Sequence, residues 1–165
     1  GPAGRGYAAI FRWADAQCLR PNPPDQTAYE RLRALPPVRS LKIIDGVYDL
    51  HLMLSKKGLI AVDFYDGNVL IDFDADRAIV CDIDLYRPAP AVNDRGRMQG
   101  SSRFLSPEEY QMGAALDECT NVYALGALAF EFFGSNLDRS RETWRGLPRL
   151  YAVASKATNA ERRDR

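Results

Sequence analysis

The sequence has little histidine, little cysteine and no excess of either charge. A single histidine, His51, excludes zinc sites built on several histidines and any Ser-His-Asp arrangement that does not use it. The three cysteines are odd in number and widely spaced, which is typical of reduced thiols rather than of a disulfide framework. Because 22 basic residues balance 22 acidic ones, no overall field favours a charged partner, and binding depends on local sites.

Long apolar runs are also absent. No stretch approaches the ~20 residues that span a bilayer, and the start of the chain lacks the charged and apolar regions of a signal peptide. We therefore expect a cytoplasmic protein that binds neither a membrane nor nucleic acid. The chain opens on Gly-Pro-Ala-Gly instead of Met, which is typical of a linker or a cleavage scar, so we expect a piece of a longer protein.

Helical periodicity dominates what the sequence does contain. The 165 residues, of which 46% are hydrophobic, are enough for one domain with one core. Apolar residues recur every three or four positions over residues 38–56 and 120–133, and the second stretch is apolar nearly all round, as buried helices are. Further helices are predicted over residues 27–35 and within 143–159, and residues 106–109 are typical of a helix start.

Short apolar stretches divided by Asp and Gly clusters predict small hairpin strands. They are expected at residues 7–13, 59–62, 69–73 and 78–81. Residues 84–106 contain prolines and glycines without periodicity, which predicts a long surface segment. Together these patterns predict an α+β fold that is predominantly α.

Residues suited to phosphoryl transfer flank one predicted hairpin. Asp63 and Asn68 precede the strand at 69–73, and Asp82 and Asp84 follow the strand at 78–81. Phosphoryl transfer needs a carboxylate that orients the attacking hydroxyl and oxygen ligands for magnesium. Asp63, Asn68 and Asp82 are the right residue types for these roles.

Four ordered blocks of the sequence resemble the protein-kinase superfamily. Residues 61–68 resemble the catalytic loop H-R-D-L-K-P-x-N, and Asp82 matches the first residue of the metal motif D-F-G. Residues 100–108, Gly-Ser-Ser-Arg-Phe-Leu-Ser-Pro-Glu, resemble the activation-segment ending G-T-P-x-Y-M-A-P-E, and residues 121–132 resemble the helix D-V-W-S-L-G-x-x-L-x-E-L. The resemblance implies a protein-kinase-like C-lobe with short β-hairpins and most of the N-lobe absent. It divides the chain into residues 1–16, a last N-lobe strand and hinge, and residues 17–165, the C-lobe.

The resemblance also implies the site residues and ATP with magnesium as cofactors. Asp63 would orient the substrate hydroxyl, with Asn68 beside it in the catalytic loop, and Asn68, Asp82 and Asp84 would hold magnesium. The hinge backbone that meets adenine would be that of Ala14, Asp15 and Ala16.

Three further residues have structural roles by the same resemblance. Glu108 would pair with an arginine near the chain end, for which Arg165 is the first choice and Arg163 the second. Asn121 stands where kinases have a buried Asp, and its amide oxygen would accept hydrogen bonds from the catalytic-loop backbone.

The chain departs from the kinase pattern at several positions. Ala61 and Val62 replace the His and Arg of the catalytic loop, Tyr65 replaces its Lys, and Ile83-Asp84 replaces Phe-Gly. No Gly-rich loop, strand Lys or helix Glu precedes Tyr7. We therefore expect the chain alone to bind ATP poorly and to transfer negligible phosphate.

Three functions stay open at this point. The first is phosphate transfer from ATP to a protein Ser/Thr hydroxyl in the intact parent. Tyr65 and Asp84 favour a small-molecule kinase of the aminoglycoside phosphotransferase type, which the Ser-Pro-Glu at 106–108 opposes. Loss of the basic residues at 61–62 favours a pseudokinase or scaffold, which the retained acids oppose. An exposed lobe interface would also favour self-association.

Overall fold

The computed structural model describes residues 10 and 12–165, which form an α+β fold with four α-helices and three small antiparallel sheets. The helices are α1 (Thr27–Ala34), α2 (Pro37–Lys56), α3 (Glu118–Phe133) and α4 (Pro148–Ala157). The strands are β1 (Gln17–Cys18), β2 (Leu59–Ile60), β3 (Val69–Asp72), β4 (Arg77–Val80), β5 (Arg87–Pro88), β6 (Ala91–Val92) and β7 (Ala115–Leu116). Single 3-10 turns are η1 (Asp66–Asn68), η2 (Pro107–Tyr110) and η3 (Arg162–Asp164).

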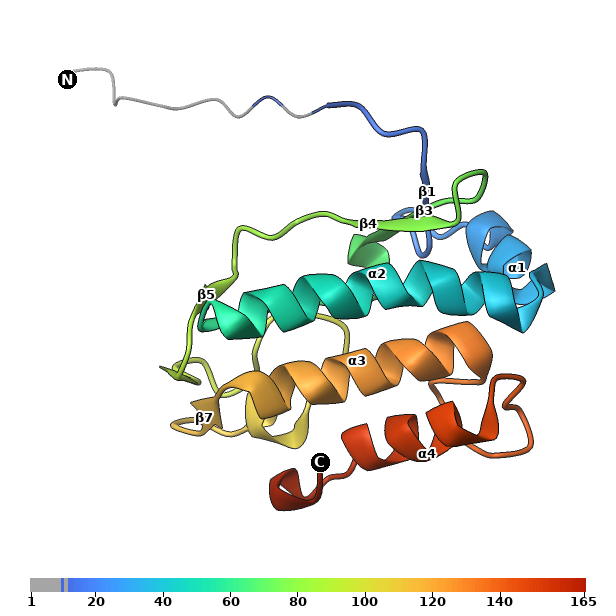
Figure 1. The fold of residues 1–165 in the computed structure, drawn as a ribbon. Coiled ribbons are helices and arrows are strands. Elements are labelled where there is room, and N and C mark those ends of the chain that lie inside the picture. The colour runs from blue at the N-terminus through green and yellow to red at the C-terminus, as the bar shows by residue number, and fades with distance from the viewer. Residues whose placement is uncertain (1–9, 11) are drawn as a thin grey trace, which may run out of the picture.

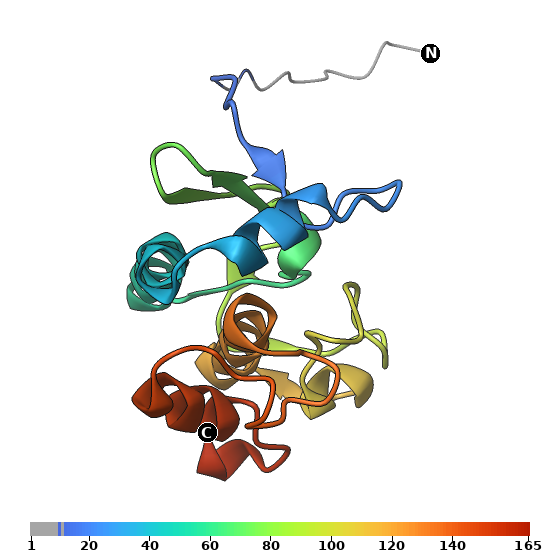
Figure 2. The same cartoon turned by 90° about the vertical axis from the view of Figure 1, so that its right-hand side faces the viewer.

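The elements lie in layers. The β1-β3-β4 sheet lies on one side of α2, α3 lies on the other side, and α4 lies beyond α3 (Figure 1). Figure 2 looks nearly along the axes of α2 and α3. No helix in the described part of the chain combines the length and the apolar character that a membrane span requires.

Helix α2 confirms the prediction for residues 38–56. Pro37 occupies its first turn, where a missing N–H costs nothing. Its apolar face is buried, and Ile43, Ile44 and Val47 are each at most 1% exposed. The helix ends before Gly58, which takes a φ of 66° in the left-handed region that terminates helices.

Helix α3 is the buried centre of the fold, as its apolar sequence predicts. Asp117 caps its start by accepting a hydrogen bond from the N–H of Cys119 at 2.9 Å. Most of its side chains are buried, and Gly126 allows α4 to approach closely. A Cβ at Gly126 would lie 2.7 Å from the Cβ of Ala157.

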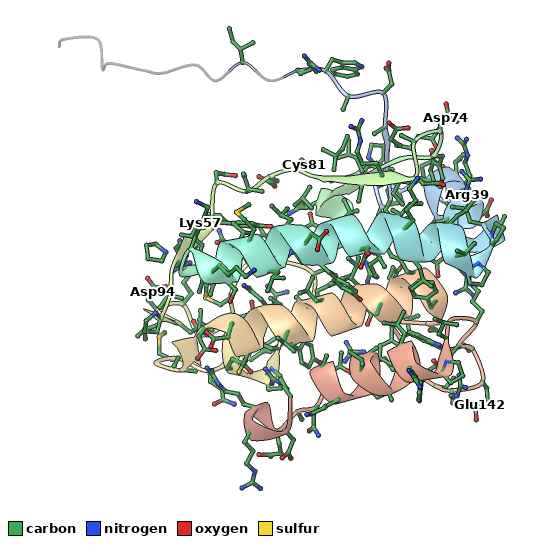
Figure 3. The ribbon with its side chains drawn as sticks, viewed as in Figure 1. Arg39, Lys57, Asp74, Cys81, Asp94 and Glu142 are labelled. Atoms are coloured by element: carbon green, nitrogen blue, oxygen red, sulfur yellow. The ribbon has the colours of Figure 1, made fainter. Side chains whose placement is uncertain are left out.

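The predicted hairpin at 69–81 is present as β3 and β4. Val69 pairs with Val80 at one end and Asp72 pairs with Arg77 at the other. Figure 3 shows Asp74 at the turn and Cys81 away from it along the hairpin. The register therefore places Asn68 and Cys81 opposite each other, at the end remote from the turn.

The prediction of a surface segment over residues 84–106 is wrong for several residues between 93 and 106, although others there are exposed. Asn93 and Met98 are fully buried, and Phe104 is 1% exposed. The N–H of Met98 donates to the carbonyl oxygen of Glu109 at 2.8 Å. Met98 and Leu105 are buried because they belong to a second apolar cluster, made of Ile60, Val62, Met98, Leu105 and Leu116.

Other boundaries differ from the expectations in smaller ways. Residues 106–109 begin only the single turn η2. The tail helix begins at Pro148 because Trp144 instead packs its ring edge-to-face on Phe130, with centroids 5.3 Å apart. Of the predicted strand at 7–13, residues 7–9 and 11 lie outside the described residues, and the other three are not in a strand.

Candidate active site

The loop between β2 and β3 carries two of the predicted site residues. Asp63 has a φ of 64°, in the left-handed region that few residues other than glycine adopt. Asn68 ends η1 and is 4% exposed. Its Nδ2 donates a hydrogen bond of 2.8 Å to the carbonyl oxygen of Asp63, which holds the loop in shape and leaves Oδ1 for another partner.

The β3–β4 hairpin brings Asp82 to the same end of the sheet. The N–H of Cys81 donates to the carbonyl oxygen of Asn68 at 3.0 Å, just beyond the last strand pair. Asp82 follows with a φ of 55°, and the side chains of Asp82 and Asp84 are exposed. Backbone conformations of this kind are common at functional sites. Of the four non-glycine residues with a positive φ in the described part of the chain, two are predicted site acids, Asp63 and Asp82, and the others are Asp76 and Arg139.

Neighbouring negative charge raises the pKa of two of the acids. Partial burial, followed by the negative charges of Asp82 and Asp84, raises the pKa of Asp63. Interaction with the Asp84 carboxyl group, followed by desolvation, raises the pKa of Asp82. A group of neighbouring carboxylates favours a cation.

The predicted ligand set for magnesium combines one amide oxygen with carboxylates. In the described part of the chain, no three His, Cys, Asp or Glu side chains gather in a way that could hold a metal ion by themselves. The set that the kinase resemblance implies is the Oδ1 of Asn68 with the carboxylates of Asp82 and Asp84. These are hard oxygen ligands, and magnesium in proteins usually keeps several waters and uses one or two carboxylates.

A cavity of about 780 Å³ extends from two of the predicted metal ligands, Asp82 and Asp84, to the predicted hinge. Its lining residues are Arg12, Trp13, Ala14, Ala16, Leu70, Ile79, Val80, Cys81, Asp82, Ile83 and Asp84. Apolar side chains of the hairpin form one wall, and the two acids lie at its end. Asp15, the third predicted hinge residue, lines an adjoining hollow of about 320 Å³, which shares Ala14 and Ala16 with the cavity.

Asp63 faces a different pocket, of about 500 Å³, lined by Asp63, Tyr65, Arg97, Gln99, Gly100 and Ser101. Gly100 has a φ of 119°, and a Cβ there would lie 3.1 Å from Oδ1 of Asp63. Glycine is needed at this position both for its backbone conformation and for the close approach to Asp63.

The two predicted structural contacts are present. Oδ1 of Asn121 accepts a hydrogen bond of 3.0 Å from the N–H of Ala61, so α3 holds the start of the site loop. Arg165 donates to both carboxylate oxygens of Glu108, at 2.6 and 2.9 Å. Burial opposes ionisation, but the hydrogen bonds from Arg165 lower the pKa of Glu108. Arg163, the second choice, lies 4.0 Å from Asp164 instead.

Sequence reasoning missed a network beneath the loop in which two buried carboxylates bind two arginines whose side chains are 28% and 27% exposed. Arg103 donates to both oxygens of Asp66 at 2.8 and 2.7 Å and to Glu131 at 3.0 Å. Arg20 donates to Glu131 at 2.8 Å and lies 3.5 Å from Asp66. Asp66 and Glu131 are at most 2% exposed. The network joins the loop at Asp66, the later segment at Arg103 and α3 at Glu131. No pattern in the sequence near these residues predicts it.

His51 has no part in this chemistry. It is 3% exposed, its Nδ1 lies 2.8 Å from the carbonyl oxygen of Val47, and its ring meets that of Phe64 edge-on at 4.4 Å. Burial lowers its pKa. It is a core histidine, as its apolar helix position indicates.

No model of a known protein family matches the chain, and no curated protein matches it either.

Proposed function

We propose that this chain is the C-terminal lobe of a protein-kinase-like phosphotransferase that moves the γ-phosphate of ATP to a protein Ser/Thr hydroxyl. The observation that carries the proposal is the meeting of Asp63, Asn68 and Asp82 at one end of the β3–β4 hairpin, beside a cavity that Ala14 and Ala16 also line. The order of the four sequence blocks that resemble kinases supports the same assignment.

Each residue has a role that its position supports. Asp63 accepts a hydrogen bond from the substrate hydroxyl, orients it and takes its proton during transfer. Asn68, Asp82 and Asp84 are the magnesium ligands. Bound magnesium would neutralise charge on the ATP phosphates. The apolar hairpin wall contacts adenine, and in the parent protein a second lobe covers the open side of the cavity.

A small-molecule kinase is the second candidate. The second acid beside Asp82, at position 84, favours it, because this acid and Tyr65 are the features by which the sequence resembles those enzymes. The buried Glu108–Arg165 pair in the Ser-Pro-Glu ending favours the protein kinase.

Phosphate transfer by the full-length protein tests the assignment of Asp63. We expect Asp63→Asn to lower the rate by about 10²- to 10⁴-fold, the scale of general-base catalysis, without changing the melting temperature. Asp49→Asn, at an exposed position on α2, is the matched control and should leave the rate unchanged. Undiminished transfer by Asp63→Asn would exclude the assignment.

Calorimetry on the full-length protein tests the metal set independently. ATP binding should require magnesium and should weaken in Asp82→Ala. Failure of the intact protein to bind ATP under any condition would favour a pseudokinase.

A further inference from the structure

We propose that the pocket beside Asp63 selects acceptor peptides that carry a carboxylate close to the hydroxyl, and that Arg97 binds this carboxylate. The inference rests on the proposed function and names its substrate class. The pocket shares no lining residue with the cavity assigned to the nucleotide, so a peptide can occupy it independently.

Arg97 is held in place by two main-chain carbonyl groups. Its Nη1 donates to Met98 and its Nη2 donates to Gly100, both at 3.1 Å. Met98 is itself fully buried and anchored to Glu109. In the described part of the chain these partners are carbonyl oxygens rather than a carboxylate. The guanidinium therefore keeps its full charge at an exposed position, with three of its five N–H donors free for a ligand.

Gly100 links this cation to Asp63. The glycine contacts the Asp63 carboxylate closely enough that a Cβ would lie 3.1 Å from Oδ1, and its carbonyl oxygen binds Arg97. A negative and a positive side chain thus lie on either side of one residue. Since an extended residue spans ~3.5 Å, a hydroxyl at Asp63 and a carboxylate at Arg97 fit within about two residues of one peptide.

The charges and the shape of the pocket both favour an acidic peptide. Asp63 repels an anion at its side of the pocket, so a negative group on the substrate is directed to Arg97. A substrate lysine beside Arg97 would be repelled. Small-molecule sites are usually enclosed and mostly apolar. This pocket is open and lined mainly by polar and charged residues, which suits an extended peptide.

The test compares three serine peptides that differ only in one residue beside the serine: Glu, Gln or Lys. We expect the full-length protein to have a higher kcat/KM for the Glu peptide than for the Gln peptide, by about 2- to 5-fold, the scale of an exposed ion pair. The preference should shrink in high salt, because salt screens exposed charges. Arg97→Gln should remove it, and Arg97→Glu should reverse it toward the Lys peptide.

Arg95→Gln is the matched control. Arg95 is also exposed, lies two residues away and has Asp94 4.0 Å from it, so its replacement should leave the preference intact. Equal kcat/KM for all three peptides in the wild-type protein would overturn the inference and leave the proposed function standing. An equal loss for all three peptides in Arg97→Gln would also overturn it, because it would show a structural role.

A binding measurement separates failure of the inference from failure of the proposed function. Should no peptide be phosphorylated, the proposed function fails, and an NMR titration of the chain with the same peptides then tests the pocket alone. Shifts of the Gly100 and Ser101 amides that need both Glu in the peptide and Arg97 in the protein would support the pocket. Shifts that persist with the Gln peptide, or in the Arg97→Gln protein, would overturn the inference.

Discussion

Replacement of Arg103 by methionine removes the centre of the buried charge network while keeping a side chain of similar length. Arg103 bonds both oxygens of Asp66 and one oxygen of Glu131, at 2.7 to 3.0 Å. Without it, two carboxylates that are almost completely buried share only Arg20. Removing one partner of a buried pair costs about 3–5 kcal/mol, and we expect about 3 because Arg20 still bonds Glu131.

Urea unfolding at pH 7, followed by circular dichroism, measures this loss. Arg95→Met is the matched control, and it should change the free energy of unfolding by less than about 0.5 kcal/mol because its side chain is 53% exposed. Adding Asp66→Asn to Arg103→Met removes one of the uncompensated charges and should restore part of the lost stability. A loss below about 1 kcal/mol, or a double variant no more stable than Arg103→Met, would refute the reasoning.

Two further predictions concern stability. Gly126→Ala should lower the free energy of unfolding by about 1–3 kcal/mol, measured by urea unfolding, because its Cβ would lie 2.7 Å from that of Ala157. Gly46→Ala, on the exposed face of α2, should raise it by about 0.5–1 kcal/mol. Changes of the same sign would contradict the packing. Burial raises the pKa of Glu109 to about 7, above its unfolded value of 4.5. Between these two values the native state holds a proton on Glu109 that the unfolded state has lost. The free energy of unfolding, measured by urea unfolding relative to Glu109→Gln, should therefore fall by up to about 3 kcal/mol as pH rises from 4.5 through 7. A difference between the two proteins that does not change with pH would exclude this pKa shift.

The elements that could be predicted from the sequence are those with local signals. Periodicity placed α2 and α3 within two residues of their observed bounds, and Asp and Gly clusters placed the β3–β4 hairpin. The burial of Met98 and Phe104, within residues 84–106, was not predicted because it depends on distant partners. Met98 is covered by residues such as Ile60 and Leu116, and neither is near it in the sequence.

In the candidate site, too, contacts between neighbouring residues could be predicted and contacts between distant residues could not. The approach of Asn68 to Asp82 follows from the register of one hairpin, which neighbouring residues determine. The network of Arg20, Asp66, Arg103 and Glu131 joins residues up to 111 positions apart. Such contacts leave no pattern in the sequence around any one member, so only the folded chain reveals them.

Val62 bears on the choice between a catalyst and a scaffold. The sequence favours a scaffold at this point because Val62 stands where kinases have an arginine that binds the activation segment. In the fold, Val62 is 3% exposed and belongs to an apolar cluster with Met98 and Leu105, close to or within the residues that resemble that segment. Apolar burial of this kind contributes roughly 25 cal/mol per Å² without needing a charged partner. The loop and the segment are therefore held together by packing, so the missing arginine by itself does not argue against catalysis by Asp63.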